Sequence, residues 1–195
     1  MNSSRNRDIL FSIYSDKRTV FTLNDIAVLT GESNFNNLNK KINYYVGQGR
    51  LERPRKGIYV KKEYNPEELA CKIYTPSYIS LEYILQEAGV IFQYDSRITS
   101  VSYLSREIEV ENKTYSYRRI KGEIVVNTAG IIRNANINKA TAERAFLDMI
   151  YLNGERYFDN LKPLDKDFMK RLLPLYNSKI LSERVGKILK NGGYR

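Results

Sequence analysis

The sequence predicts an α+β protein whose helices and strands occur in separate blocks. Apolar residues recur at helical spacing in the first third of the chain, alternate with a period of two between Ile91 and Arg133, and return to helical spacing after Lys139. Blocks of this kind are typical of α+β folds, and 195 residues leave room for two small domains. We expect an N-terminal domain over residues 1–64, and a C-terminal domain over residues 65–195 with a mainly antiparallel sheet and flanking helices.

The segment from Thr22 to Gly31 predicts the first half of a helix-turn-helix. Thr22 is a good N-cap, and Ile26 and Ala27 belong to an apolar set at helical spacing. The small Ala27 lets a second helix approach closely, and Gly31 can take the positive φ that a tight turn between helices often needs. An earlier helix over Ser4–Tyr14 would complete a set of three.

The second helix of this pair is expected to run from a cap at Ser33 to about Gln48. Its inward face carries Phe35, Leu38, Ile42, Tyr45 and Val46. The polar residues of its outward face are Asn34, Asn36, Asn37, Lys40, Lys41 and Tyr44. Asn can bond adenine at two atoms in the major groove, and Lys attracts phosphates whatever the base sequence. This outward face is typical of a DNA recognition helix.

A basic β-hairpin is expected directly after that helix. A strand over Leu51–Arg53 and a turn over Pro54–Gly57 precede a strand in which Ile58 and Val60 point inward. The hairpin tip carries three cations, Arg53, Arg55 and Lys56. Asn, Lys and charged hairpin tips are also common on ordinary solvated surfaces. The helix pair, the turn glycine and the hairpin arrive in order, however, and together they predict a winged helix-turn-helix domain that binds double-stranded DNA.

The distribution of charge agrees with this interpretation. The chain has 32 Lys or Arg and 22 Asp or Glu residues, a net charge of +10 and a pI near 9.5. Residues 1–62 hold 12 cationic and 5 acidic residues, a net charge of +7, whereas residues 63–195 hold 20 and 17. Because the excess positive charge lies mostly in the first third, it argues against a winged helix that contacts only another protein.

Several other classes of protein are excluded by composition. The first residues lack the apolar run of a signal peptide, and no later stretch approaches the ~20 apolar residues of a membrane span, so we expect a cytoplasmic protein without membrane partners. Without histidine the chain cannot use Ser-His or Cys-His catalysis or the usual zinc ligand sets. The single cysteine, Cys71, is expected to be buried. We expect no cofactor, no metal site and no catalytic residue.

A metal-dependent nuclease is the enzyme alternative. Asp95, Glu111 and Lys113 imitate the two carboxylates and the lysine of such sites. In that chemistry the Glu and the Lys stand on one face of a rigid strand, whereas Glu111–Lys113 is the best candidate for a tight turn in this region. The sequence therefore favours a DNA-binding protein that is not an enzyme.

The second domain is predicted to contain a strand meander between helices. The helices are expected over Pro66–Tyr74, Ile79–Ala88, Thr141–Leu152, Lys166–Tyr176 and Ser178–Lys190. The strands are expected over Ile98–Ser102, Arg106–Val110, Thr114–Ile120, Glu123–Val126 and Ile131–Arg133.

Four cations on or beside these strands form a possible surface for nucleic acid or an acidic partner, namely Arg106, Arg118, Arg119 and Lys121. Tyr115 and Tyr117 lie nearby but are typical sheet residues, and strand alternation sends Arg118 and Arg119 to opposite faces. Glu143 and Arg144, at the start of a later helix, are expected to make capping and surface contacts.

Five segments, spread over nearly the whole chain, carry a resemblance to a known family: KGIYV (56–60), SYISLEYILQEAGVI (77–91), RITSV (97–101), TYSYRRIK (114–121) and ATAERAFLDMIYL (140–152). In these segments the chain resembles the AbiEi-type antitoxins, which are winged-helix regulators of bacterial abortive-infection toxin-antitoxin pairs. The resemblance implies repression of the protein's own promoter through inverted repeats, and a nucleotidyltransferase toxin of the AbiEii type as functional partner. It also implies that the second domain opposes this toxin without requiring a stable complex. A stand-alone winged-helix regulator is the alternative.

Overall fold

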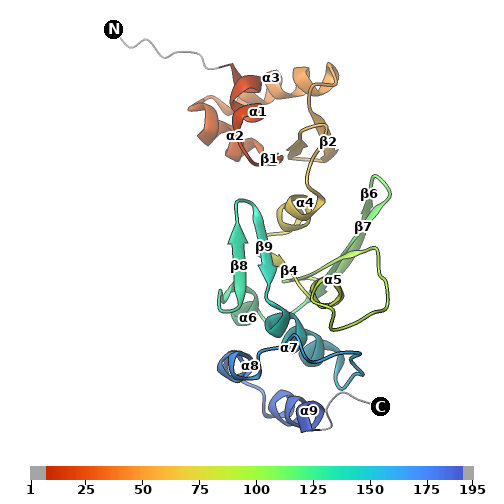
Figure 1. Ribbon diagram of the computed structural model, residues 1–195. Helices are drawn as coiled ribbons and strands as arrows, with labels where there is room; N and C mark the ends of the chain where they lie inside the picture. The colour runs from red at the N-terminus through yellow and green to blue at the C-terminus, as the bar shows by residue number, and fades with distance from the viewer. Residues whose placement is uncertain (1–7, 191–195) are drawn as a thin grey trace. The chain divides into compact units, whose positions relative to one another are not determined.

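The structure, a computed structural model, describes residues 8–190 and is of the predicted α+β class (Figure 1). The described residues include a three-stranded and a six-stranded sheet. The chain divides into two compact units, Met1–Ile73 and Tyr74–Arg195, and each has one of these sheets. No helix within residues 8–190 combines the length and the apolar character that crossing a membrane requires.

The first unit combines helices with the three-stranded sheet. Its described elements are α1 (Ile9–Ser15), β1 (Val20–Thr22), α2 (Leu23–Thr30), α3 (Phe35–Gly47), β2 (Glu52–Arg55), β3 (Ile58–Val60) and α4 (Pro66–Ile73). Strand β3 lies between β1 and β2 and is antiparallel to both. Strand β1 was not predicted from the sequence, and it joins the sheet directly to the start of α2.

Helix α2 begins and ends as predicted. The hydroxyl of Thr22 accepts the backbone N–H of Asp25 at 3.1 Å, and the Asp25 carboxylate accepts the backbone N–H of Thr22 at 2.7 Å. This reciprocal pair satisfies N–H groups that a helix start otherwise leaves without partners. At the other end, Gly31 has a φ of 71°, a left-handed conformation that glycine adopts without strain.

Helix α3 begins one residue later than predicted. Asn34, not Ser33, is the N-cap, because the Asn34 side-chain oxygen accepts the backbone N–H of Asn37 at 3.0 Å. Phe35 was predicted to face inward, but it is 46% exposed. The buried stripe of α3 thus begins one turn later, at Leu38.

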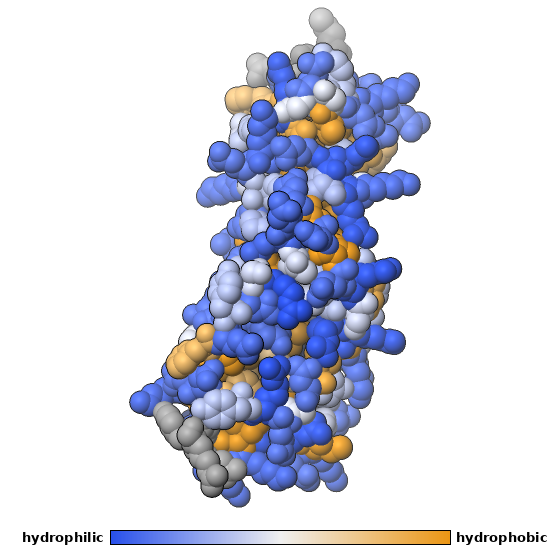
Figure 2. Space-filling model, turned by 90° about the vertical axis from the view of Figure 1, so that its right-hand side faces the viewer, coloured by the Kyte–Doolittle hydropathy of each residue, from blue (hydrophilic) through white to orange (hydrophobic). Residues whose placement is uncertain are grey.

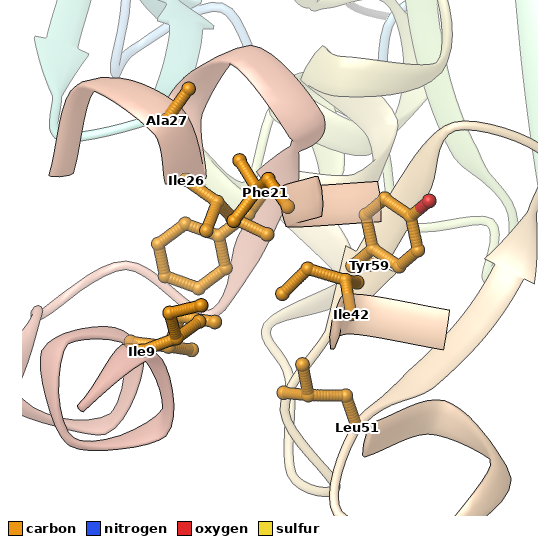
Figure 3. Close-up of a cluster of buried hydrophobic side chains, with 9 residues drawn as sticks. Ile9, Phe21, Ile26, Ala27, Ile42, Leu51 and Tyr59 are labelled. Atoms are coloured by element: carbon orange, nitrogen blue, oxygen red, sulfur yellow. The ribbon is translucent and has the colours of Figure 1, made fainter. Parts of the chain in front are cut away.

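Side chains from the three helices α1–α3 and from strands β1 and β3 gather in one hydrophobic core (Figure 3). Its buried residues are Ile9, Ile13, Phe21, Ile26, Ala27, Leu38, Ile42, Leu51 and Tyr59. Helix α1 begins at Ile9, since the Asp8 side chain accepts the backbone N–H of Leu10 at 2.9 Å. The predicted Ser4–Tyr14 helix starts earlier, and its residues 4–7 lie outside the described part of the chain.

The hairpin β2–β3 has a shorter turn than predicted. Pro54 lies within β2 and not in the turn, which the left-handed Gly57 completes with a φ of 81°. Because β2 is an edge strand with a register shift between Glu52 and Arg55, it tolerates a proline that cannot donate a hydrogen bond. Ile58 and Val60 are buried as predicted, and Tyr59 between them is buried as well, since β3 is the central strand.

Helix α4 belongs to the first unit, although the domain boundary was expected between residues 64 and 65. The buried Glu68 accepts the backbone N–H groups of Thr19 and Val20 at 2.8 and 3.1 Å. The ammonium of Lys72 lies 2.9 Å from the carboxylate of Asp25. Because of these polar contacts with β1 and α2, the first unit extends to Ile73.

The second unit contains the six-stranded sheet and five α-helices within its described part. Its elements are β4 (Ser77–Ile79), α5 (Glu82–Glu87), β5 (Ile98–Ser102), β6 (Arg106–Val110), β7 (Lys113–Arg119), α6 (Gly122–Val126), β8 (Ile131–Asn134), β9 (Ile137–Ala140), α7 (Ala142–Asn153), α8 (Lys166–Leu172), the 3-10 helix η1 (Leu173–Tyr176) and α9 (Lys179–Lys190). The strands are ordered β6-β7-β5-β4-β9-β8.

Most strand pairs of this sheet are antiparallel, as predicted, but the sheet is mixed and is not a simple meander. The pairs β6–β7, β4–β5 and β8–β9 are antiparallel, whereas β5–β7 and β4–β9 are parallel. Each parallel pair brings together strands that are not consecutive in the sequence, so the chain must cross over between them. Period-two patterning locates strands but contains no information on such crossovers.

Two local predictions in this unit were wrong, and one strand was missed. Glu123–Val126 was predicted as a strand because of its β-branched residues, but it belongs to α6, where Ile124 and Val125 are buried on one side of a short helix. The predicted helix Ile79–Ala88 begins too early, since Ser77–Ile79 is the buried strand β4 and the helix starts at Glu82. Strand β9 was not predicted.

Arg144 and Asp148 of α7 lie at the centre of a buried polar network, and the predicted surface contacts of Arg144 are wrong. Both side chains are fully buried, and their charged groups are 3.4 Å apart. The Arg144 guanidinium donates to the Tyr78 hydroxyl and to the backbone oxygens of Ile124 and Ala129. Glu143, also buried, accepts the backbone N–H of Asp165 at 3.0 Å.

The carboxylate of Asp148 receives three hydroxyl groups in this network. Tyr78 and Ser80 donate to one oxygen at 2.9 and 2.8 Å, and Tyr176 donates to the other at 2.6 Å. Burial and the neighbouring carboxylate raise the pKa of both tyrosines well above the ordinary value, so their hydroxyls stay protonated and donate. Through these hydrogen bonds, the buried carboxylate of Asp148 connects α7 to β4 and to η1.

Large hydrophobic side chains that remain exposed are scattered over both units. Examples are Phe11 and Val28 in the first unit and Phe92 and Ile132 in the second, each at least 60% exposed. On the face of the protein in Figure 2, hydrophilic residues predominate and hydrophobic residues occur in separate patches. That face therefore has the character of a solvated surface.

Candidate nucleic-acid interface

The exposed face of α3 carries side chains that suit base edges and phosphates. Asn36, Asn37, Lys40 and Tyr44 are exposed, as predicted, and lie on the side of the helix opposite the buried Leu38. Helical spacing of three to four residues places these four side chains along one face over two turns. Amide, ammonium and phenol groups are thus available there to the same ligand.

Two other residues predicted to contact DNA already have partners within the unit. The side-chain oxygen of Asn34 caps α3, although the residue as a whole is exposed. Lys41 is half-buried, and its ammonium lies 4.0 Å from the carboxylate of Glu32. An ion pair this long and this exposed to solvent is weak, so Lys41 can still turn toward a phosphate.

Asn39 and Asn43 were not predicted as site residues, yet they connect α3 to the hairpin. The Tyr59 hydroxyl donates to the side-chain oxygen of Asn39 at 3.2 Å, and the Arg53 guanidinium donates to that of Asn43 at 3.2 Å. The two asparagines are also linked by a hydrogen bond of 3.4 Å. The sequence offered one signal for this pair, because residues spaced four apart lie on the same face of a helix. These contacts fix the hairpin beside the exposed face of α3.

Positive charge dominates the segment of the chain that contains α3 and the hairpin. Between residues 33 and 62 the sequence has eight Lys or Arg residues and a single acid, Glu52. The predicted tip residues Arg53, Arg55 and Lys56 are all exposed. Arg53 lies in β2 and donates to Asn43, whereas Lys56 lies in the turn itself. Clustered cations with few carboxylates create a field that attracts polyanions.

The cations predicted as a surface in the second unit do not share one face of its sheet, and Lys121 lies outside the sheet at the start of α6. Tyr115 and Tyr117 are buried, so they form no aromatic surface. Arg118 lies on the opposite face of β7 and donates to the side-chain oxygen of Asn153 at 3.0 Å. The remaining three cations are exposed, namely Arg106, Arg119 and Lys121.

The structure brings the residues of the nuclease alternative together only in part, since Asp95 and Lys113 line one open pocket and Glu111 is not among its lining residues. The Asp95 carboxylate is held by the Arg97 guanidinium at 2.6 Å, and this hydrogen bond lowers the pKa of Asp95. Glu111 and Asn112 have positive φ values of 49° and 62°, which confirms the predicted turn. Within the described residues, no three His, Cys, Asp or Glu side chains gather as metal ligands would.

Comparison with known proteins finds a similar fold but no similar sequence family. No protein-family model matches the sequence. No curated protein matches it either. Among solved structures, the chain is similar to the crystal structure of the RV2827C protein from Mycobacterium tuberculosis, with a TM-score of 0.51, 12% sequence identity, and coverage of 99% of this chain and 78% of that chain. At this identity the likeness shows a common mixed α+β fold and no more.

Proposed function

We propose that the first unit is a winged helix-turn-helix domain that binds double-stranded DNA. The observation that carries the proposal is the exposed face of α3, which has no carboxylate and is bonded to a basic hairpin. The order α1, β1, α2, α3, β2, β3 and the antiparallel sheet β1-β3-β2 support it, because they place a second helix and a hairpin side by side.

In this proposal α3 enters the major groove and the hairpin contacts the adjacent backbone. The width of the major groove admits an α-helix, and an Asn side chain there can bond the N6 and N7 atoms of adenine. Asn36 and Asn37 would read bases, and Lys40 would meet a phosphate. Arg55 and Lys56 would bind phosphates or the neighbouring minor groove. The contacts of Asn39 and Asn43 would hold the two elements in register.

We further propose that the protein represses its own promoter and acts in the cytoplasm as the antitoxin of a nucleotidyltransferase toxin. Support comes from the resemblance to AbiEi-type antitoxins in the sequence. Two of the resembling segments, residues 77–91 and 140–152, contain β4, α5 and most of α7 in the second unit. A stand-alone regulator would share the DNA interface but would lack a toxin gene beside its own.

Binding of the protein's own promoter fragment tests the first proposal. Fluorescence anisotropy should show tighter binding to that duplex than to a shuffled duplex of equal length and composition, with affinity that falls steeply as salt rises. Equal affinity for the two duplexes would contradict site-specific repression, and an absence of binding would contradict the DNA interface. Cleavage of the labelled duplex on addition of magnesium would instead support the nuclease alternative.

Co-expression tests the antitoxin proposal separately. Cells that express the neighbouring nucleotidyltransferase reading frame should stop growing, and co-expression of this protein from an unrelated promoter should restore growth. Since the unrelated promoter removes autoregulation, rescue would report activity against the toxin itself. Failure of a well-expressed protein to rescue would favour the stand-alone regulator.

A further inference from the structure

The second unit has an open cavity of about 690 Å³ at the end of β7. This volume lies within the range of about 300 to 1,000 Å³ that is usual for small-molecule sites. The backbone of its wall is fixed, because the Arg119 N–H donates to the Ser105 hydroxyl and the Ile120 N–H donates to the backbone oxygen of Ser102, both at 2.9 Å. The cavity is therefore a preformed feature of the unit.

Two cations line this cavity and are exposed to solvent. Arg119 ends β7, and Lys121 follows it after one buried residue. Within the described residues neither makes an ion pair, and Glu123 is the one acid among the lining residues. Two cations with one carboxylate give the cavity a net positive charge, which suits an anionic ligand.

Two tyrosine rings line the same cavity, and each packs against a second tyrosine ring. Tyr103 is 47% exposed, and its ring packs edge-on against Tyr74 with centroids 6.3 Å apart. Tyr151 packs against the buried Tyr176 at 5.4 Å. Rings that are already fixed lose little conformational entropy when a planar ligand stacks on their remaining surface.

We propose that this cavity binds a nucleotide. Its phosphates would contact Arg119 and Lys121, and its base would lie against Tyr103 and Tyr151. Gly122 lines the cavity between these groups, and a Cβ atom added there would meet no other atom within 4 Å. The cavity shares no residue with the proposed DNA interface of the first unit, so each site can be altered by substitutions that leave the residues of the other unchanged.

Isothermal titration of the full chain with ATP, GTP, CTP and UTP tests the proposal. At least one nucleotide should bind the wild-type protein, and the variant Arg119→Gln with Lys121→Gln should bind it about tenfold or more weakly, because two charge-assisted contacts are removed. The matched control, Arg133→Gln with Lys162→Gln, removes two exposed cations elsewhere in the unit and should bind as the wild type does. Equal weakening in both double variants would overturn the proposal, as would the absence of binding at millimolar nucleotide.

A second pair of variants tests whether the nucleotide occupies the cavity itself. Gly122→Leu fills open space without changing charge and should also weaken binding, with circular dichroism confirming the fold. Lys40→Ala with Arg55→Ala alters the proposed DNA interface and should leave nucleotide binding unchanged; loss of binding in this variant alone would place the nucleotide on the first unit and overturn the assignment. Pyrophosphate should bind more weakly than the nucleotide, and equal affinity would overturn the role of the tyrosine rings.

Discussion

Asn34 and Asn37 lie three residues apart in one polar run, and in the structure only the side chain of Asn34 caps the helix. The side chain of Asn34 caps α3, and Asn37 supplies only its backbone N–H to that cap, so the exposed Asn37 amide is available to a base. The sequence pattern placed both side chains on the outward face. It could not show that Asn34 caps the helix, because Ser33 is an equally good N-cap residue.

The two asparagines should therefore respond differently to substitution. Asn37→Ala should cost about 1 to 3 kcal/mol of binding free energy on the promoter site and little on shuffled DNA. Asn34→Ala should instead lower the stability of the first unit by about 1 kcal/mol. Anisotropy titrations and urea unfolding of both variants separate these effects. Equal loss of affinity on both duplexes would show that Asn37 contacts only the backbone.

Arg144 shows which residues a sequence pattern places wrongly. A charged residue near a helix start is usually solvated, and that rule predicted surface contacts for Arg144. The partners that make its burial possible are the Tyr78 hydroxyl and the backbone oxygens of Ile124 and Ala129, which lie 66, 20 and 15 residues away in the chain. The one local signal was Asp148, an opposite charge one turn further along an otherwise apolar stretch of α7.

At the scale of elements, prediction succeeded where a segment alternates and is bounded by clear turns. Strands β5 and β6 have the predicted bounds, and the turn before β7 has the positive φ values expected of it. Prediction failed for two strands of three residues and for one helix of five residues. Strands β1 and β4 and helix α6 are each shorter than the window in which periodicity can be recognised, and tertiary packing decides their conformation.

The start of α2 should show a pH dependence that depends on Asp25. Burial raises the pKa of Asp25, but hydrogen bonds from Thr22 and the Lys72 ammonium outweigh it and leave this pKa below its ordinary value. A carboxyl whose pKa is lowered on folding stabilises the fold above the unfolded pKa, near 3.9, and loses that contribution as pH falls through the folded value. Asp25→Asn should therefore be less stable than wild type at pH 6, and this difference should shrink below about pH 4.

Urea unfolding of the wild type and Asp25→Asn between pH 6 and pH 2.5 measures this difference. Glu63→Gln removes an exposed carboxyl from the same unit and serves as the control. A stability difference that stayed constant down to the lowest pH would show that Asp25 contributes nothing through its charge.

The hairpin should contribute to affinity without contributing to sequence preference. Replacing Arg53, Arg55 and Lys56 by Ala should weaken binding to promoter and shuffled DNA alike, and should reduce the slope of log K against log salt by about one unit for each phosphate that the hairpin no longer neutralises. Since Arg53 also bonds Asn43, Arg53→Ala alone should weaken promoter binding more than Lys56→Ala does. A salt titration with an unchanged slope would mean that the hairpin points away from DNA.

At the scale of the whole molecule, the sequence predicted two domains but not the boundary between them. Composition changes near Pro66, whereas α4 remains with the first unit through Glu68 and Lys72. Those partners lie about 48 residues away in the chain, beyond the reach of any local pattern. The same limit applies to the order of the six-stranded sheet, since its parallel pairs join strands that are distant in sequence.

A fragment of residues 1–73 should consequently be more stable than one of residues 1–64. The shorter fragment loses the acceptor for the Thr19 and Val20 N–H groups, and a buried group without a partner costs about 1 to 3 kcal/mol. Thermal unfolding of the two fragments, followed by circular dichroism, compares them directly. Equal melting temperatures would show that α4 adds nothing to the first unit.

The two units should also separate in cells. Residues 1–73 should retain weak promoter binding without rescuing cells from the toxin, and residues 74–195 should rescue without repressing. A promoter-reporter assay and a growth assay of each fragment, with folded expression checked by circular dichroism, give the answer. Rescue by residues 1–73 alone would contradict this division, because repression would then account for the whole antitoxin activity.

The bonds from Tyr59 to Asn39 and from Arg53 to Asn43 also bear on how this protein could be engineered. Grafting a foreign α3 into the first unit would leave the phenol and the guanidinium of the hairpin without their acceptors. A change of target sequence should therefore be made by exchanging residues 34–60 as one cassette. In a library of chimeric regulators, whole-cassette exchanges should give well-folded proteins more often than exchanges of the helix alone.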